Sequence, residues 1–214
     1  MKAESLLKDI RSSLIPLNDK ILNHPYIIEA EKGILPMDKI KAFAANQYYI
    51  ISHDAKSLSL MLSRATSLDE IKLFRKLAEG DLEGLHCIIK MAEELGFTIQ
   101  DLENYDPIPD AVAYTHYLCA LAQFTSPGEQ IMALTANLPV WGLNCGRLSE
   151  ALRVKYNIKE TSFLDLFAGS TDELEREALQ IIERYLPEKE NAMRRVVRLI
   201  QAYELMFWDG LYKS

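Results

Sequence analysis

The sequence predicts an all-α fold, a multi-helix bundle that forms a single domain over residues 1–214, and three observations predict it. Apolar residues recur at helical spacing through most of the chain, whereas alternating, β-branched runs bounded by turn residues are absent. The segments between the periodic stretches are short, without internal repeats or linker-like tracts. A chain of 214 residues, 49% of them hydrophobic, is long enough to bury a substantial core.

Proline, glycine and capping residues mark the expected helix boundaries in chain order. Pro16 should kink or restart the first helix, because proline removes a backbone donor. Pro25 opens a short helix that ends at Gly33, a typical C-terminal cap. The first helix carries apolar residues on one face, at Leu6, Leu7, Ile10 and Leu14. The later helices are expected over 37–65, 67–95, 99–104, 109–124, 130–156, 163–167, 171–186 and 187–212.

Charge and cysteine content exclude several classes of function. The net charge is −7 and the basic residues are scattered, whereas nucleic-acid binding relies on many Lys and Arg contacts to phosphate. Cys87, Cys119 and Cys145 lie far apart without CxxC spacing, which indicates free thiols in a reducing compartment. The charged N-terminal residues do not resemble a signal peptide, and no apolar run approaches the roughly 18 residues of a membrane span. We therefore expect a cytoplasmic protein with no nucleic-acid or membrane partner.

The last predicted helix carries a carboxylate in unusual surroundings. Glu204 lies among five large apolar or aromatic residues, Tyr203, Leu205, Met206, Phe207 and Trp208. Burial disfavours the charged form and raises the pKa, which prepares a glutamate for proton transfer near neutral pH. The alternative is a solvated glutamate at a helix edge that pairs with Lys213 or an arginine.

The long helix over 37–65 also places polar groups in a stretch of small and aromatic residues. Asn46, Gln47, Tyr48 and Tyr49 lie there, and buried amides and phenols must find hydrogen-bond partners. A polar heteroaromatic ligand is one possible partner. An inter-helix hydrogen bond with core tyrosines is the other.

The next helix presents Glu79, Glu83 and His86 on one face. Glu-x-x-His is half of the di-metal carboxylate arrangement of some bundles, but the other histidines lack a glutamate three residues earlier. We therefore predict no metal site and no cofactor. His86 is retained as a candidate substrate-site residue, with a packing role as the alternative.

The helix over 130–156 should be kinked at Pro139, which leaves a backbone carbonyl free as a possible acceptor for a ligand. Asn137 and Trp141 flank the proline, and Cys145 lies one turn beyond Trp141. A free cysteine is most often a small core residue. To act as a nucleophile, Cys145 would need a neighbouring base or cation to lower its pKa.

Five motifs together resemble the TenA family, which comprises thiaminase II and its relatives, within the TENA/THI-4/PQQC group of haem oxygenase-like bundles. The resemblance covers nearly the whole chain. The motifs are His24-Pro25-Tyr26 with 33–36 (Gly-Ile-Leu-Pro), 46–49 (Asn-Gln-Tyr-Tyr), Ala113-Tyr114-Thr115, 138–141 (Leu-Pro-Val-Trp) and 203–209. The resemblance implies a homotetramer that hydrolyses aminopyrimidines in thiamine salvage. It further implies that Glu204 transfers a proton and that Tyr114 stacks on the ring.

Three positions depart from the family pattern. An aspartate that holds the ring falls on Gln47, and a cysteine nucleophile after Leu-Pro falls on Val140. A further family tyrosine is replaced by Leu143. Another branch of the family works without that cysteine. The first hypothesis is thus a thiaminase II-like hydrolase, in which Cys145 is a substitute nucleophile and the substrate contacts come from Gln47, Tyr48, Tyr49, Tyr114, His86, Trp141 and Phe207. The alternative is a catalytically diverged relative that binds or processes another small N-heterocycle.

Overall fold

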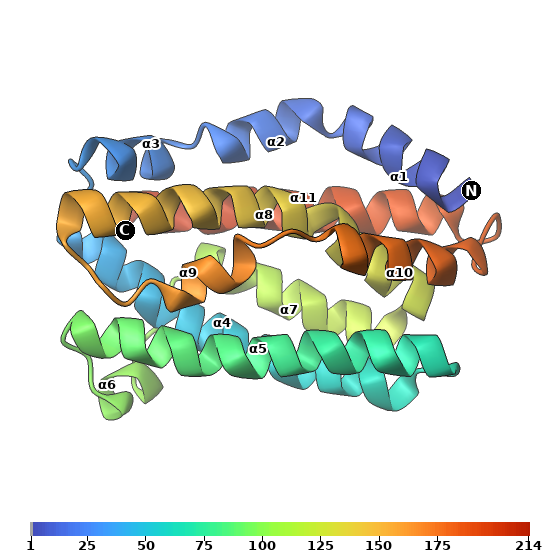
Figure 1. Ribbon diagram of the computed structural model, residues 1–214, viewed down its shortest axis with the longest axis horizontal. Coiled ribbons are helices and arrows are strands. Elements are labelled where there is room, and N and C mark those ends of the chain that lie inside the picture. Colours follow the sequence, from blue (N-terminus) through green and yellow to red (C-terminus); the bar gives the residue numbers. More distant parts are fainter. Residues whose placement is uncertain (1) are drawn as a thin grey trace.

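The computed structural model describes residues 2–214, which form eleven α-helices and no strand (Figure 1). The all-α prediction is therefore confirmed for this part of the chain. The helices are α1 (Lys2–Ser13), α2 (Ile15–Leu22), α3 (Pro25–Lys32), α4 (Met37–Arg64), α5 (Leu68–Glu94), α6 (Ile99–Glu103), α7 (Pro109–Phe124), α8 (Pro127–Tyr156), α9 (Ser162–Phe167), α10 (Asp172–Glu183) and α11 (Glu190–Lys213).

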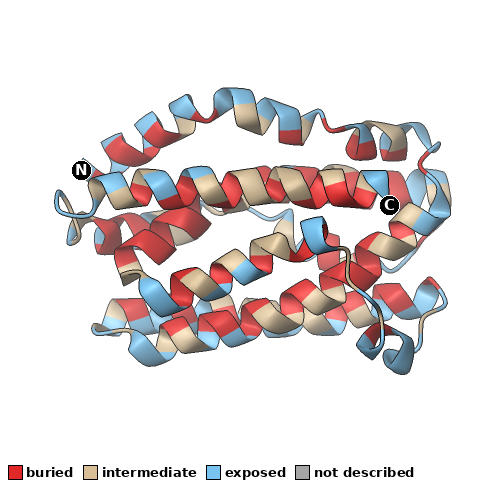
Figure 2. Cartoon of the chain, turned by 180° about the vertical axis from the view of Figure 1, so that it is seen from behind, coloured by how far each residue is buried: buried red, intermediate tan, exposed pale blue. Residues whose placement is uncertain are grey.

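The helices form a layered bundle around a central space. In Figure 1, α8 and α11 run side by side through the middle, with α1–α3 along one side of them and α4 with α5 along the other. Helix α7 packs on both α4 and α11, and it closes the space between these layers from behind. Helices α9 and α10 lie at the front, where each contacts both α5 and α8. Figure 2 shows that the buried faces of the long helices point into this arrangement.

Most helix boundaries follow the capping signals in the sequence. Pro16 lies in the first turn of α2, and Pro25 opens α3 behind the N-cap His24. Gly33 ends α3 with a φ of 71°, a left-handed conformation that glycine adopts without a Cβ clash. Helix α5 starts at a capping box.

Two boundaries differ from the sequence prediction. Helix α8 begins at Pro127, three residues earlier than expected, because Ser126 and Glu129 form a capping box around its first turn. Pro187 does not open the last helix but lies in a run of turns over 184–189. In these turns Arg184 bonds to Glu70 of α5, and so the connection is held against α5.

Aromatic side chains dominate the part of the core beside the central space. Phe43 of α4 contacts the rings of Trp141, Phe163, Phe207 and Trp208, with centroid separations of 6.0–6.5 Å. Together with Phe43, these rings come from four different helices. The group therefore ties α4, α8, α9 and α11 together at one end of the space where the site is formed.

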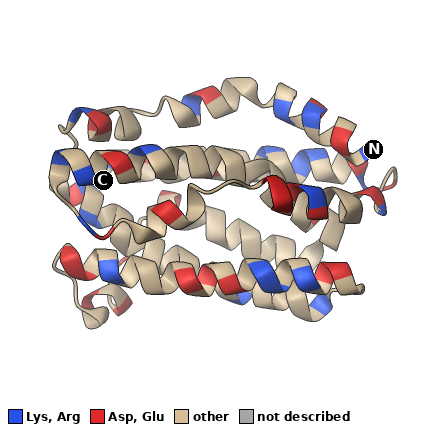
Figure 3. Cartoon of the chain, in the orientation of Figure 1, with Lys and Arg blue, Asp and Glu red and all other residues tan. Residues whose placement is uncertain are grey.

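Acidic and basic residues both occur along α5, without a large patch of one sign (Figure 3). None of the helices in residues 2–214 has the length and apolar character that crossing a bilayer requires.

Candidate active site

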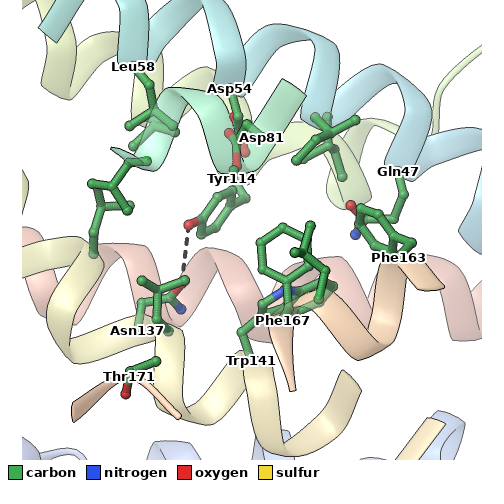
Figure 4. Close-up of a pocket in the computed structure, with 18 of the residues that line it drawn as sticks. Gln47, Asp54, Leu58, Asp81, Tyr114, Asn137, Trp141, Phe163, Phe167 and Thr171 are labelled. Carbon is green, nitrogen blue, oxygen red and sulfur yellow. Dashed lines mark hydrogen bonds between the residues drawn. The ribbon is translucent and has the colours of Figure 1, made fainter. Parts of the chain in front are cut away.

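A cavity of about 260 Å³ occupies the central space. Its walls come from α4, α5, α7, α8 and α11, and α9 with residues 169–171 covers its front (Figures 1 and 4). Most of the lining is apolar, and the polar groups are few. They are Gln47, Asp54, Lys76, Asp81, Tyr114, Asn137, Ser170, Thr171 and Glu204. An apolar cavity with a small set of convergent polar groups is the usual form of a small-molecule site.

Glu204 of α11 lies in this cavity and is only 2% exposed. Asn137 Nδ2 donates to its Oε2 at 2.5 Å, while its Oε1 has no hydrogen-bond partner within residues 2–214. Burial raises the pKa of Glu204 to about 8, against the opposing effects of the Trp208 indole and the Asn137 amide. The alternative of a solvated, ion-paired Glu204 is therefore wrong, and Lys213 pairs instead with Asp209 at 3.5 Å.

Asn137 connects Glu204 to two further polar side chains. Its Nδ2 also donates to Gln201 Oε1 at 2.6 Å, and its Oδ1 accepts from Tyr114 Oη at 3.1 Å, the bond drawn in Figure 4. Both the nitrogen and the oxygen of the Asn137 amide therefore form hydrogen bonds. Burial raises the pKa of Tyr114 well above its ordinary value, and the nearby carboxyls add to this rise. Tyr114 consequently remains a phenol and a hydrogen-bond donor.

Two aspartates lie on the opposite wall. Asp54 is on α4 and Asp81 is on α5, and Figure 4 shows them next to each other above Tyr114. Thr115 of α7 donates a short hydrogen bond to Asp54 Oδ1. Burial raises the pKa of Asp54 to about 7, with Thr115 opposing the rise. Burial and the charge of Asp54 together raise the pKa of Asp81 well above its ordinary value.

The spacing along α4 explains how it supplies two cavity groups. Asp54 follows Gln47 by seven residues, or two turns, so both project from one face of the helix. Gln47 is 4% exposed, and its amide forms no hydrogen bond within residues 2–214. Because buried amides are normally bonded, this amide is available to a ligand.

The carbonyl that Pro139 frees is not available to a ligand. Proline at 139 removes the backbone bond to the carbonyl of Thr135, four residues earlier. Arg11 Nη2 from α1 donates to that carbonyl at 3.1 Å and also binds Glu175 at 2.7 Å. The expectation of a ligand acceptor here is therefore wrong, because α1 satisfies the carbonyl from the far side of α8.

The structure brings five of the predicted site residues together around the cavity: Gln47, Tyr114, Trp141, Glu204 and Phe207. Four others lie outside the lining. Tyr48 packs against the apolar core, and Tyr49 stacks on His53 at 4.1 Å and shares a hydrogen bond with His116. His86 is exposed on α5.

Cys145 is the fourth residue outside the cavity, and its surroundings do not suit a nucleophile. It is fully buried, and burial raises its pKa well above the ordinary value, with nearby Glu204 adding to the rise. A thiol in these surroundings stays protonated. The candidate metal face of α5 is solvent-exposed at Glu79, Glu83 and His86, and no group of three potential ligands that could hold a metal occurs within residues 2–214.

Sequence reasoning missed Asp54 and Asp81. Asp54 could have been found, because it shares the face of Gln47 in the same buried helix. Asp81 follows Gly80, which also lines the cavity and where an added Cβ would meet no atom within 4 Å.

The protein is thus a helical bundle around a cavity with the form of a small-molecule site, and the comparisons with known proteins identify its family. The sequence profile described as the TENA/THI-4/PQQC family matches residues 11–214. The chain therefore belongs to this family.

The individual relatives share only a modest sequence identity with this chain. An aminopyrimidine aminohydrolase of Halalkalibacterium halodurans is 27% identical over 122 residues, which are 56% of this chain and 54% of that protein. The chain thus matches about half the length of this curated relative. A TenA homologue of P. horikoshii OT3 superposes with a TM-score of 0.81 at 20% identity, covering 97% of this chain and 98% of the other. A Shewanella denitrificans domain with a heme oxygenase-like fold gives 0.81 at 15% identity, over 97% and 92%. The predicted fold class is thereby confirmed.

Proposed function

We propose that this chain is a thiaminase II-like hydrolase that releases an amine from an aminopyrimidine in thiamine salvage, with Glu204 as the proton-transfer group. The observation that carries the proposal is the state of Glu204 in the cavity. One of its oxygens is held by Asn137, the other is unpartnered, and its pKa is about 8. The aminohydrolase relative and the family membership support the substrate class.

The pKa of Glu204 determines the direction of proton transfer. A carboxyl with a pKa near 8 is a neutral acid at pH 7, so it donates a proton in the first step. In the proposed reaction water replaces the amine on the carbon that carries it, so that a C–O bond forms, the C–N bond breaks and ammonia leaves. Glu204 protonates a ring nitrogen, or the departing nitrogen where the amine is bound in its neutral form, and the proton released by water restores the acid.

The other lining groups are suited to holding a flat, polar ring. Trp141, Phe163 and Phe207 offer aromatic surfaces in the lining, and Gln47 presents its free amide beside Phe163 (Figure 4). An amide can donate to a ring nitrogen and accept from an amino group at the same time. Gln47 therefore serves the role of the family aspartate without its charge.

Val140 and Cys145 indicate that water attacks directly. Val140 stands where the family has its cysteine, and Cys145 is a buried thiol outside the cavity. A covalent intermediate on sulfur therefore forms no part of the proposal.

The test is a steady-state assay of the purified protein with 4-amino-5-aminomethyl-2-methylpyrimidine and with thiamine, beside Glu204→Gln. We expect turnover of the aminopyrimidine and its loss in the variant. Turnover that persists in Glu204→Gln would refute the role of Glu204. Saturable binding without turnover would favour the alternative, a diverged relative that binds another N-heterocycle. The uncharged Gln47 in place of the family aspartate and the absent cysteine support that alternative.

The remaining proposals concern the state of the protein in the cell. We propose a cytoplasmic homotetramer built from one TenA-like domain over residues 1–214, by resemblance to the family. Large apolar side chains such as Phe124, 85% exposed, and Leu68, 67% exposed, are available for subunit contacts. Light scattering coupled to size exclusion would measure the mass, and a monomer would refute the tetramer.

A further inference from the structure

The cavity contains more carboxyl groups than the proposed reaction uses. Glu204, Asp54 and Asp81 all line it, from α11, α4 and α5. Lys76 is the cationic residue in the lining among residues 2–214, and it is directed to α10, where Glu173 and Glu177 lie 3.5 and 3.8 Å from its Nζ. The protein therefore provides no counter-charge for the two aspartates.

We propose that Asp54 and Asp81 form a subsite for the ammonium group of the substrate, so that the cavity selects heteroaromatic primary amines as cations over their neutral analogues. The inference rests on the proposed function, because the ammonium is taken to belong to the substrate of the same cavity.

The two aspartates have free oxygen atoms on the cavity side. Thr115 occupies Asp54 Oδ1, which leaves Oδ2 for a ligand. Asp81 forms no hydrogen bond or ion pair with residues 2–214, although it lies beside Asp54 in the cavity wall (Figure 4). An ammonium has three donors, enough to bond both aspartates together.

An independent observation shows that this cavity is built for a polar ligand. The amide of Gln47 is 4% exposed and unpartnered, and it lies two turns from Asp54 on the same face of α4. Two helical turns correspond to about 10 Å along the axis. Gln47 and the aromatic rings thus form one subsite, and the aspartate pair forms a second. This arrangement suits a ring that carries a short amine arm.

Electrostatics favour a cation at the pair. Two neighbouring carboxyls cannot both ionise readily in a buried site, and a bound cation removes that penalty. The titratable groups that face them are Tyr114 from α7, Glu204 from α11 and, at the cavity edge, Lys76. Because burial raises the pKa of Asp54 to about 7, a cation that binds at neutral pH should displace a proton.

A divalent metal ion fits the pair less well. Mg²⁺ and Ca²⁺ require six or more oxygen ligands, and the neighbours of the pair in the lining include Ile50, Ile51 and Leu77. No group of three potential metal ligands is formed within residues 2–214. An organic ammonium needs fewer contacts and tolerates the apolar walls.

The test uses benzylamine, an aromatic ring with an ammonium arm, and its neutral analogue benzyl alcohol, measured by calorimetry at pH 7.5 in two buffers of different ionisation enthalpy. We expect benzylamine to bind about tenfold or more tightly than the alcohol, the size of a charge-assisted hydrogen bond, with release of protons. Asp54→Asn and Asp81→Asn should each remove this preference and reduce the proton release, while benzyl alcohol binds as before. Circular dichroism verifies that each variant is folded.

Glu83→Gln, on the exposed face of α5, is the matched control and should behave as wild type. Equal affinities for the amine and the alcohol, or a preference that survives both aspartate variants, would overturn the inference. Tight Mn²⁺ binding that either variant abolishes would overturn it in favour of a metal site. Benzylamine binding does not depend on turnover, so a failed aminopyrimidine assay beside a positive result here would reject only the proposed reaction.

Discussion

Replacing Glu204 with glutamine should increase the stability of the protein, and the gain should grow with pH. In the folded protein the carboxyl titrates near pH 8, because it is buried, whereas an ordinary glutamate titrates near 4.5. The folded state therefore holds a proton that the unfolded chain has released between these values. Each rise of one pH unit in this window lowers the free energy of unfolding by about 1.4 kcal/mol. From pH 5.5 to 7.5 the destabilisation of the folded state by Glu204 should therefore increase by about 3 kcal/mol.

The assay is urea unfolding of wild type and Glu204→Gln at pH 5.5 and 7.5, with the slope against urea compared to verify that both unfold in the same way. Glutamine can still accept the Asn137 hydrogen bond, so the pH-dependent part of the difference isolates the charge. Glu93→Gln, on the exposed face of α5, is the control and should leave the pH dependence of wild type unchanged. A stability difference between Glu204→Gln and wild type that is the same at both pH values would refute the raised pKa, and with it the assignment of Glu204 as a neutral acid.

Three further predictions test the core, the cavity wall and the reaction. Phe43→Ala should lower the unfolding free energy by about 3–5 kcal/mol, because it empties the centre of the aromatic group; a loss below about 1 kcal/mol in urea would contradict this. A Cβ at Gly142 would meet the Phe167 carbonyl oxygen at 2.6 Å, so Gly142→Ala should destabilise by about 1–3 kcal/mol, whereas Gly80→Ala, with open space, should stabilise by up to about 1 kcal/mol in the same assay. If turnover requires Glu204 as an acid, kcat should be retained below about pH 8 and lost above it, and a pH–rate profile that rises through pH 8 would argue for a base.

The helices were predictable because their signals are local. Proline, glycine and capping boxes act within a few residues, so the starts of α2, α3 and α5 could be placed from the sequence. The turns around Pro187 could not, because Arg184 is held there by Glu70, more than a hundred residues away. Contacts of that range leave no periodic pattern in the sequence.

The site was predictable where its residues are unusual for their surroundings. Glu204 stands out as an acid in an aromatic run, and Gln47 as an amide in a buried helix. Tyr48 and Tyr49 flank Gln47 in the sequence, yet adjacent positions on a helix face different directions, which is why they miss the cavity. Asp81 gave no signal of this kind, because α5 carries many acids and only the packing of α4 on α5 distinguishes it from those in solvent.

A comparison within the molecule indicates that the cavity carboxyls serve function. Glu70 is also buried, at 1% exposure, but Thr66, Tyr185 and Arg184 bond both of its oxygens. Although burial alone would raise it, these bonds hold the pKa of Glu70 below its usual value, so its charge stabilises the fold.

Glu204 receives only partial compensation, from Asn137 and the Trp208 indole, and Asp81 receives none within residues 2–214. One oxygen of Glu204 is unpartnered, Asp81 has no hydrogen bond or ion pair within residues 2–214, and the pKa of each is raised. Each therefore costs stability increasingly as the pH rises towards its pKa. A core under selection for stability alone would replace such groups with apolar side chains of similar size. Since both open onto one cavity with Gln47 and Asp54, their missing partners are expected to be supplied by the substrate, and ligand binding should stabilise the protein most at the higher pH.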